Sequence, residues 1–127
     1  MPALGGILES SLYVEDLQHS VSFYQRIFGF ELIESHSDRL RAMKAAPQQV
    51  LLLFKKGASP DHDGAGRLHL AFAIPRAAEA DWEAWLAQQG VTIVERKTWQ
   101  RGGSSLYFRD PDQHLLELVT PGCWANY

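Results

Sequence analysis

The sequence is poor in the features that mark secreted, membrane-spanning or nucleic-acid-binding proteins. It contains a single cysteine, Cys123, which excludes an internal disulfide and fits a reducing compartment. No apolar run approaches the roughly 20 residues needed to span a bilayer, and the opening MPALGGIL lacks the basic start of a signal peptide. The net charge of −3 gives no electrostatic reason to bind nucleic acid or anionic lipid. We therefore expect a cytoplasmic protein with no membrane or nucleic-acid partner.

The composition is that of a globular domain. The chain has 127 residues, of which 46% are hydrophobic and 21% charged, enough for one domain or for two small modules sharing a core. Its one thiol, Cys123, has no Lys, Arg or His beside it in the tail PGCWANY to lower its pKa. We predict that this cysteine has no catalytic role.

The sequence describes nearly the same structure twice. Residues 7–54 and residues 67–119 each read as a strand, a helix and three short apolar strands. Between them, residues 55–66 (KKGASPDHDGAG) have the composition of a linker, with no side chains to bury. We predict two βαβββ modules, at about 6–54 and 67–121, in a single domain of the α+β class.

The ends of both predicted helices are marked in the sequence. Asp16 stands where it can cap the first helix, and Gly29 stands where that helix ends. In the second half, Pro75 opens the helix and Gly90 closes it.

Three predicted strands each carry a polar residue where the alternation favours an apolar one. They are Glu9 in ILESSLYV, His69 in RLHLAFAI and Glu117 in HLLELVTP. Each falls on the strand face opposite its apolar neighbours. Because helices cover the more apolar face, we expect the three side chains to line the inside of a curled sheet. Two carboxylates and an imidazole suit one divalent metal ion, which could be Mn²⁺, Fe²⁺, Ni²⁺, Co²⁺ or Zn²⁺.

Such a site predicts Lewis-acid chemistry on a small substrate that carries two neighbouring oxygens. Glu9 and Glu117 are also the candidate catalytic residues, because a carboxylate can act as a general base, either in exchange with the metal or alone. The alternative is a metal-free cleft in which the three polar residues are remnants.

A smaller set of aromatic and basic residues is a candidate for substrate contacts. Tyr13 shares the strand face of Glu9, and three further residues flank a glycine pair in TWQRGGSSLYF: Trp99, Arg101 and Tyr107. This stretch could form a lid with an anion contact. The alternative is an ordinary loop in which Trp99 packs against its neighbour.

The remaining histidines are weaker candidates for metal binding. His19 lies off the apolar stripe of its helix, His36 falls in a loop and His114 in a turn. His62 belongs to Asp61-His62-Asp63, which looks metal-binding but lacks the spacing of a calcium loop and lies in the predicted linker.

Two stretches resemble the vicinal oxygen chelate superfamily, which includes glyoxalase I, fosfomycin-resistance proteins, extradiol dioxygenases and bleomycin-resistance proteins. LYVEDLQHSVSFYQRIFGFEL is similar to the family form V-x-D-L-x-x-S-x-x-F-Y-x-x-x-L-G-F, and YFRDPDQHLLELVTP is similar to F-x-D-P-D-G-N-x-x-E-L. The resemblance covers nearly the whole chain. It implies paired βαβββ modules whose curled mixed sheets enclose a cleft, and usually a homodimer.

The resemblance places the family's metal ligands at Glu9, His69 and Glu117. Glu9 stands where a His is commoner, and Leu52 or a neighbour stands where glyoxalase I has a further carboxylate, which disfavours the glyoxalase I reaction itself. A metal-dependent lyase, isomerase or transferase acting on a small oxygen-rich molecule is implied. The rivals are a metal-free protein that sequesters a ligand or drug, as in the bleomycin-resistance branch, and an extradiol-type dioxygenase.

Overall fold

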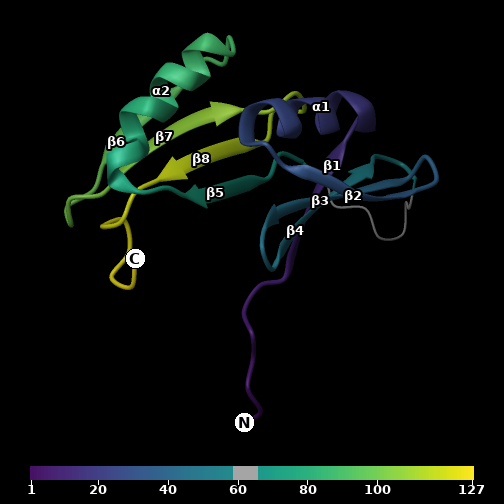
Figure 1. Ribbon diagram of the computed structural model, residues 1–127, viewed down its shortest axis with the longest axis horizontal. Helices are drawn as coiled ribbons and strands as arrows, with labels where there is room; N and C mark the ends of the chain where they lie inside the picture. The colour runs from purple at the N-terminus through teal and green to yellow at the C-terminus, as the bar shows by residue number, and fades with distance from the viewer. Residues whose placement is uncertain (59–65) are drawn as a thin grey trace. The chain divides into compact units, whose positions relative to one another are not determined.

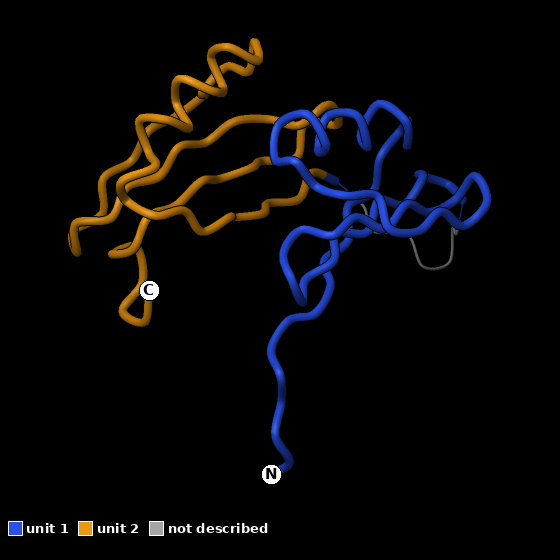
Figure 2. The backbone as a smooth tube through the Cα atoms, in the orientation of Figure 1, with its two compact units in different colours: residues 1–66 blue, residues 67–127 orange. Residues whose placement is uncertain are grey.

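The computed structural model describes residues 1–58 and 66–127. The chain divides into two compact units, residues 1–66 and residues 67–127 (Figure 2). Most of the predicted linker, with Asp61-His62-Asp63, lies outside the described residues. Nowhere in the described ranges is a helix long and apolar enough to cross a membrane.

Unit 1 contains one helix and a four-stranded mixed sheet (Figure 1). Its elements are β1 (Glu9–Val14), α1 (Leu17–Phe28), β2 (Glu31–His36), β3 (Leu40–Ala46) and β4 (Gln49–Lys55). The strand order is β1-β4-β3-β2, in which β1 runs parallel to β4 and the other neighbours are antiparallel.

Unit 2 repeats this arrangement. Its elements are β5 (His69–Ala73), a 3₁₀ turn η1 (Arg76–Ala78), α2 (Glu79–Gln88), β6 (Glu95–Thr98), β7 (Ser104–Arg109) and β8 (Leu115–Val119). The strand order is β5-β8-β7-β6, with β5 parallel to β8 and the other neighbours antiparallel. The predicted pair of βαβββ modules is therefore confirmed.

The first helix has the boundaries that its capping residues predict. The Asp16 carboxylate accepts a hydrogen bond from the backbone N–H of His19 at 2.9 Å, and so satisfies one of the free donors of the first turn. Gly29 ends the helix at a φ of 69°, a left-handed conformation that costs glycine little. The buried stripe includes Leu17, Val21 and Ile27, which places α1 against β3 and β4.

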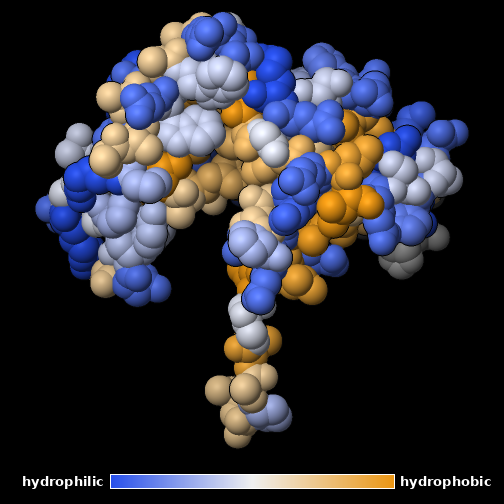
Figure 3. Space-filling view, in the orientation of Figure 1, coloured by the Kyte–Doolittle hydropathy of each residue, from blue (hydrophilic) through white to orange (hydrophobic). Residues whose placement is uncertain are grey.

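Each unit buries its own apolar layer. In unit 1 the fully buried side chains come from α1, β1, β3 and β4: Tyr24, Ile27, Leu12, Val14, Met43 and Leu53. In unit 2 they come from α2, β7 and β8: Leu86, Leu106, Phe108, Leu116 and Leu118. Large apolar side chains also remain exposed, among them Leu4, Ile7 and Leu8 in the segment before β1 (Figure 3).

Candidate metal site

The face of the unit 2 sheet that points away from α2 carries the polar side chains of interest. Arg96 of β6 forms an ion pair with Glu83 of α2 at 2.9 Å, so the face of Arg96 is turned toward the helix. Side chains alternate along a strand, and Lys97 therefore projects from the opposite face. Cross-strand register extends this second face over β7, β8 and β5. Its members are Glu95, Lys97, Ser105, Tyr107, Arg109, Leu115, Glu117, Val119, His69, Ala71 and Ala73.

The parallel pairing of β5 with β8 brings His69 and Glu117 together although 48 residues separate them in sequence. Nε2 of His69 lies 3.0 Å from Oε2 of Glu117, and Nδ1 lies 3.1 Å from the carbonyl oxygen of Leu115. Carbonyl and carboxylate oxygens both only accept, so each contact is a hydrogen bond when the ring nitrogen that faces it carries a proton. With the proton on Nδ1, a metal ion could take the place of the proton on Nε2, the arrangement expected of a metal-binding histidine.

Glu117 holds a carboxylate oxygen that is buried without a hydrogen-bond partner. The side chain is 7% exposed, and none of the described residues donates a hydrogen bond to Oε1. Such an atom costs about 1–3 kcal/mol of folding free energy while it stays without a partner. A cation held by Glu117 and His69 would supply one.

Tyr107 lies directly across from Glu117 on the same face. Burial, followed by the neighbouring carboxylate of Glu117, raises the pKa of Tyr107 from 10.0 to about 12. The ring also lies beside that of His69, with the two ring centroids 6.2 Å apart. Tyr107 is therefore a neutral phenol and a hydrogen-bond donor over the physiological pH range.

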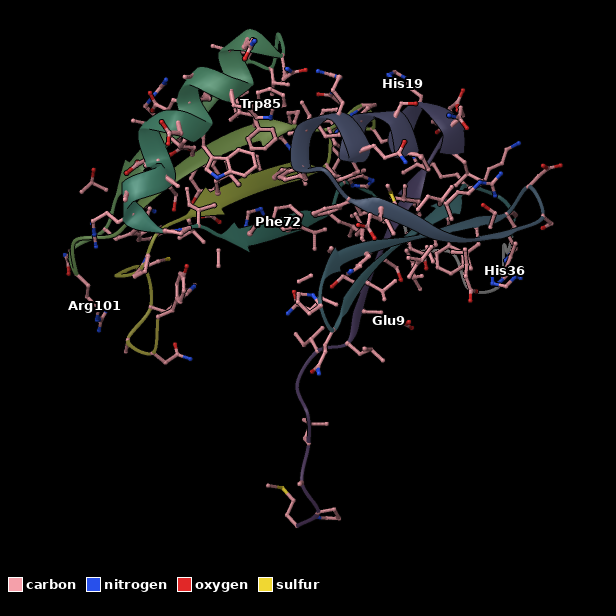
Figure 4. The ribbon with its side chains drawn as sticks, in the orientation of Figure 1. Glu9, His19, His36, Phe72, Trp85 and Arg101 are labelled. Carbon is pink, nitrogen blue, oxygen red and sulfur yellow. The ribbon has the colours of Figure 1, made fainter. Side chains whose placement is uncertain are left out.

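The hairpin between β6 and β7 adds an aromatic ring and a positive charge to this face. The indole Nε1 of Trp99 donates to Oγ of Ser105 at 2.8 Å, and Nζ of Lys97 lies 4.0 Å from the centre of the Trp99 ring. Trp99 thus packs against its own hairpin. Arg101, in the loop after β6, is exposed and projects away from the sheet (Figure 4).

Cys123 and Lys97 belong to the surroundings of Glu117, and sequence reasoning missed both. Burial of the Cys123 thiol, followed by the charge of Glu117, raises its pKa, whereas Lys97 acts in the opposite direction. The alternation that links Lys97 with Ser105 and Tyr107 could have identified the lysine. No local signal identifies the cysteine, because only the fold of the C-terminal tail brings it near Glu117.

The described chain matches a known family over most of its length. A model of the Glyoxalase/Bleomycin resistance protein/Dioxygenase superfamily matches residues 6–118. The chain belongs to this superfamily. It is 30% identical over 108 residues to a metallothiol transferase FosB of Staphylococcus saprophyticus, covering 84% of this chain and 71% of the relative. It is 26% identical over 124 residues to a lactoylglutathione lyase of Salmonella typhimurium, covering 89% and 90% of the two chains.

Solved structures of this superfamily confirm the fold. A lactoylglutathione lyase from Agrobacterium tumefaciens superposes with a TM-score of 0.86 and 25% identity, over 98% of this chain and 99% of the other. The fosfomycin resistance protein FosX from Listeria monocytogenes, in complex with Mn(II) and 1S,2S-dihydroxypropylphosphonic acid, gives a TM-score of 0.73 and 26% identity over 91% and 90% of the two chains.

The third ligand predicted from the superfamily pattern, Glu9, belongs to unit 1. It is the exposed first residue of β1 (Figure 4), and Tyr13 follows it on the same face, stacked on Phe54 with the ring centroids 5.7 Å apart. Among the residues with described positions, no group of three or more His, Cys, Asp or Glu side chains gathers as a metal site would require. Unit 2 brings two of the three predicted ligands, His69 and Glu117, within 3.0 Å of each other, and metal binding by all three residues stays a prediction.

The other histidines have structural or surface positions. His114 is 1% exposed, and its Nδ1 accepts a hydrogen bond at 2.9 Å from the backbone N–H just before β5. His36 forms an exposed ion pair, and His19 lies on the exposed side of α1. His62 lies outside the described residues.

Proposed function

We propose that this protein is a metal-dependent glyoxalase-like enzyme that acts on a small, oxygen-rich substrate. The observation that carries the proposal is the carboxylate of Glu117: its Oε2 lies 3.0 Å from Nε2 of His69, and its Oε1 is buried with no hydrogen-bond partner among the described residues. A carboxylate oxygen in that environment fits a cation better than it fits an apolar core. The relatives include a metallothiol transferase, a lactoylglutathione lyase and a protein crystallised with Mn(II), which supports the same chemistry.

His69, Glu117 and Glu9 are the proposed ligands of one divalent metal ion. When bound, the ion supplies a Lewis acid that stabilises negative charge developing on a substrate oxygen. As the third proposed ligand, Glu9 would come from unit 1, either of the same chain or of a second copy in a homodimer. If its carboxylate exchanged between the metal and the substrate, it could also act as the general base. For the homodimer, sedimentation should give twice the 14.3 kDa mass of one chain.

The protein's own side chains would orient the substrate on this face. Tyr107 would donate a hydrogen bond from its neutral phenol to an anionic oxygen, and Lys97 would attract a negatively charged substituent. Trp99 forms a flat apolar wall beside the lysine. Tyr13 and Arg101 remain candidate contacts for more distant parts of the substrate.

Among the reactions of the relatives, thiol transfer is the one we propose first. In β4, Leu52 or a neighbour in the apolar run 50–54 stands where the family pattern of glyoxalase I has a carboxylate. An apolar side chain there neither binds metal nor moves a proton. The chain is also more similar in sequence to the metallothiol transferase than to the lactoylglutathione lyase, so an isomerase or lyase reaction is our second proposal.

Metal content and activity together test this proposal. We expect the purified protein to bind Mn²⁺, Ni²⁺, Co²⁺ or Zn²⁺ near one ion per chain, and Glu117→Gln to weaken that binding by at least a hundredfold. Glu83→Gln is the matched control, because it removes a carboxylate on the opposite face of the unit 2 sheet. Activity would be measured as ring opening of fosfomycin by a thiol, and as formation of S-lactoylglutathione.

Two other activities give different results in the same experiments. A metal-free protein that sequesters a ligand is favoured by one observation, that unit 2 alone offers only His69 and Glu117 to a metal. It would bind no ion at any concentration used, yet retain affinity for an aromatic drug such as bleomycin. An extradiol-type dioxygenase would instead consume dioxygen when given Fe²⁺ and a catechol.

A further inference from the structure

Arg76 joins two segments of unit 2 that are far apart in sequence. It lies in η1, just after β5, where its Nη1 donates to the carbonyl oxygen of Gly102 and its Nη2 donates to that of Pro121 at 2.7 Å. The first carbonyl belongs to the β6–β7 loop, and the second belongs to the C-terminal tail after β8. A planar guanidinium can hold two carbonyls at once because its donors form a rigid fork.

The loop and the tail are also in direct backbone contact at this point. A Cβ atom added to Gly103 would lie 2.6 Å from the carbonyl carbon of Gly122 and 2.6 Å from the nitrogen of Cys123, so only glycine fits there. Just beyond, the backbone N–H of Ser104 donates to Oγ1 of Thr120 at 2.9 Å. The arginine therefore closes a junction that is already tightly packed.

Both segments held by this junction carry side chains to the surroundings of Glu117. The loop begins at Trp99, whose backbone carbonyl accepts from Gly102 and whose indole donates to Ser105 on the face of Glu117. The tail continues into Cys123, which is 8% exposed. The two segments are walls of the proposed site, whereas the ligands His69 and Glu117 are held independently by β5 and β8.

We propose that Arg76 is a positioning residue, which locks the β6–β7 loop to the C-terminal tail and thereby fixes the substrate-facing walls of the site without contributing to metal binding. This proposal rests on the proposed function for its consequence in catalysis. Its structural part, the junction between loop and tail, is tested independently. Arg76 itself touches neither Glu117 nor His69 in the contacts that the structure shows.

The lone cysteine is a built-in reporter for the junction. We expect Arg76→Gln to increase the rate of alkylation of Cys123 by iodoacetamide about tenfold at constant pH, because loss of two hydrogen bonds from a charged donor raises the population of the open tail. Arg76→Lys, which keeps the charge but not the fork, should give an intermediate rate. Arg96→Gln is the matched control, since it removes an ion-paired arginine from the opposite face of the same sheet, and it should leave the rate unchanged.

Steady-state kinetics then separates positioning from folding or metal binding. With the fosfomycin and thiol assay, we expect Arg76→Gln to raise KM about tenfold while kcat and the affinity for Mn²⁺ change less than twofold. Equal alkylation rates in wild type and Arg76→Gln would overturn the proposal, as would an Mn²⁺ affinity that falls together with KM. If the wild type binds no metal, the proposed function fails, but the junction can still be tested. A Cys123 alkylation rate about ten times higher in Arg76→Gln than in the wild type supports the junction, and equal rates refute it.

Discussion

Replacement of Glu117 by glutamine should reverse the order of stability of wild type and variant when metal is added. Without metal, the wild type buries one carboxylate oxygen that accepts no hydrogen bond within the described chain. A neutral amide is less costly to bury than a carboxylate with one unpartnered oxygen, so we expect Glu117→Gln to be more stable by about 1 kcal/mol. For a chain of 127 residues this corresponds to an increase in Tm of about 4 °C.

With metal present, the wild type gains folding stability from metal binding that the variant cannot gain. An ion at a free concentration of about one hundred times its Kd stabilises the folded state by about 2.7 kcal/mol, or about 10 °C in Tm. Glu117→Gln loses one ligand of three and should gain almost nothing. The wild type should therefore melt below the variant in EDTA and above it in excess metal.

Differential scanning calorimetry with EDTA, and then with Mn²⁺, Ni²⁺ or Zn²⁺, measures both parts of this prediction. Glu83→Gln removes an exposed ion pair and should shift Tm by about 2 °C or less, equally in both conditions. A wild-type Tm that no divalent metal raises would refute the reasoning. So would a Glu117→Gln variant that metal stabilises as much as it stabilises the wild type.

Three further perturbations test other parts of the structure. Because burial and Glu117 raise the pKa of Tyr107 above its unfolded value of about 10, its contribution to stability is complete below pH 10 and is lost as the pH rises through about 12. Ultraviolet titration should show late-titrating tyrosine absorbance that Tyr107→Phe reduces by the signal of one residue, and an unchanged late signal in Tyr107→Phe would contradict this. Leu12→Ala should cost about 2–5 kcal/mol in urea denaturation, since Leu12 is fully buried, whereas the exposed Leu4→Ala should cost less than about 0.5 kcal/mol. Gly103→Ala should cost about 1–3 kcal/mol and accelerate alkylation of Cys123, because the added methyl group collides with the tail; an unchanged Tm and alkylation rate would show that the tail is not packed there.

The alternation of side chains was enough to identify His69 and Glu117, because each interrupts an apolar strand. Tyr107 was a candidate only because it lies near the glycine pair in sequence, and Lys97, on the same face of the sheet, was missed. The capping residues Asp16 and Gly29 likewise predict both ends of α1 as the structure has them. These features depend on neighbours within a few positions along the chain, which is the range that periodicity and propensity describe.

Sequence alone therefore determined the repeated βαβββ order, the superfamily pattern and two residues of the candidate metal site. Only the tertiary structure decided that His69 and Glu117 lie 3.0 Å apart, that Oε1 of Glu117 has no hydrogen-bond partner within residues 1–58 and 66–127, and that Arg76 ties the β6–β7 loop to the tail beside Cys123. The physical reason is separation along the chain, because strand pairing and tail packing join residues tens of positions apart. Backbone hydrogen bonds and steric fit between such segments produce no periodic pattern in the sequence of either segment.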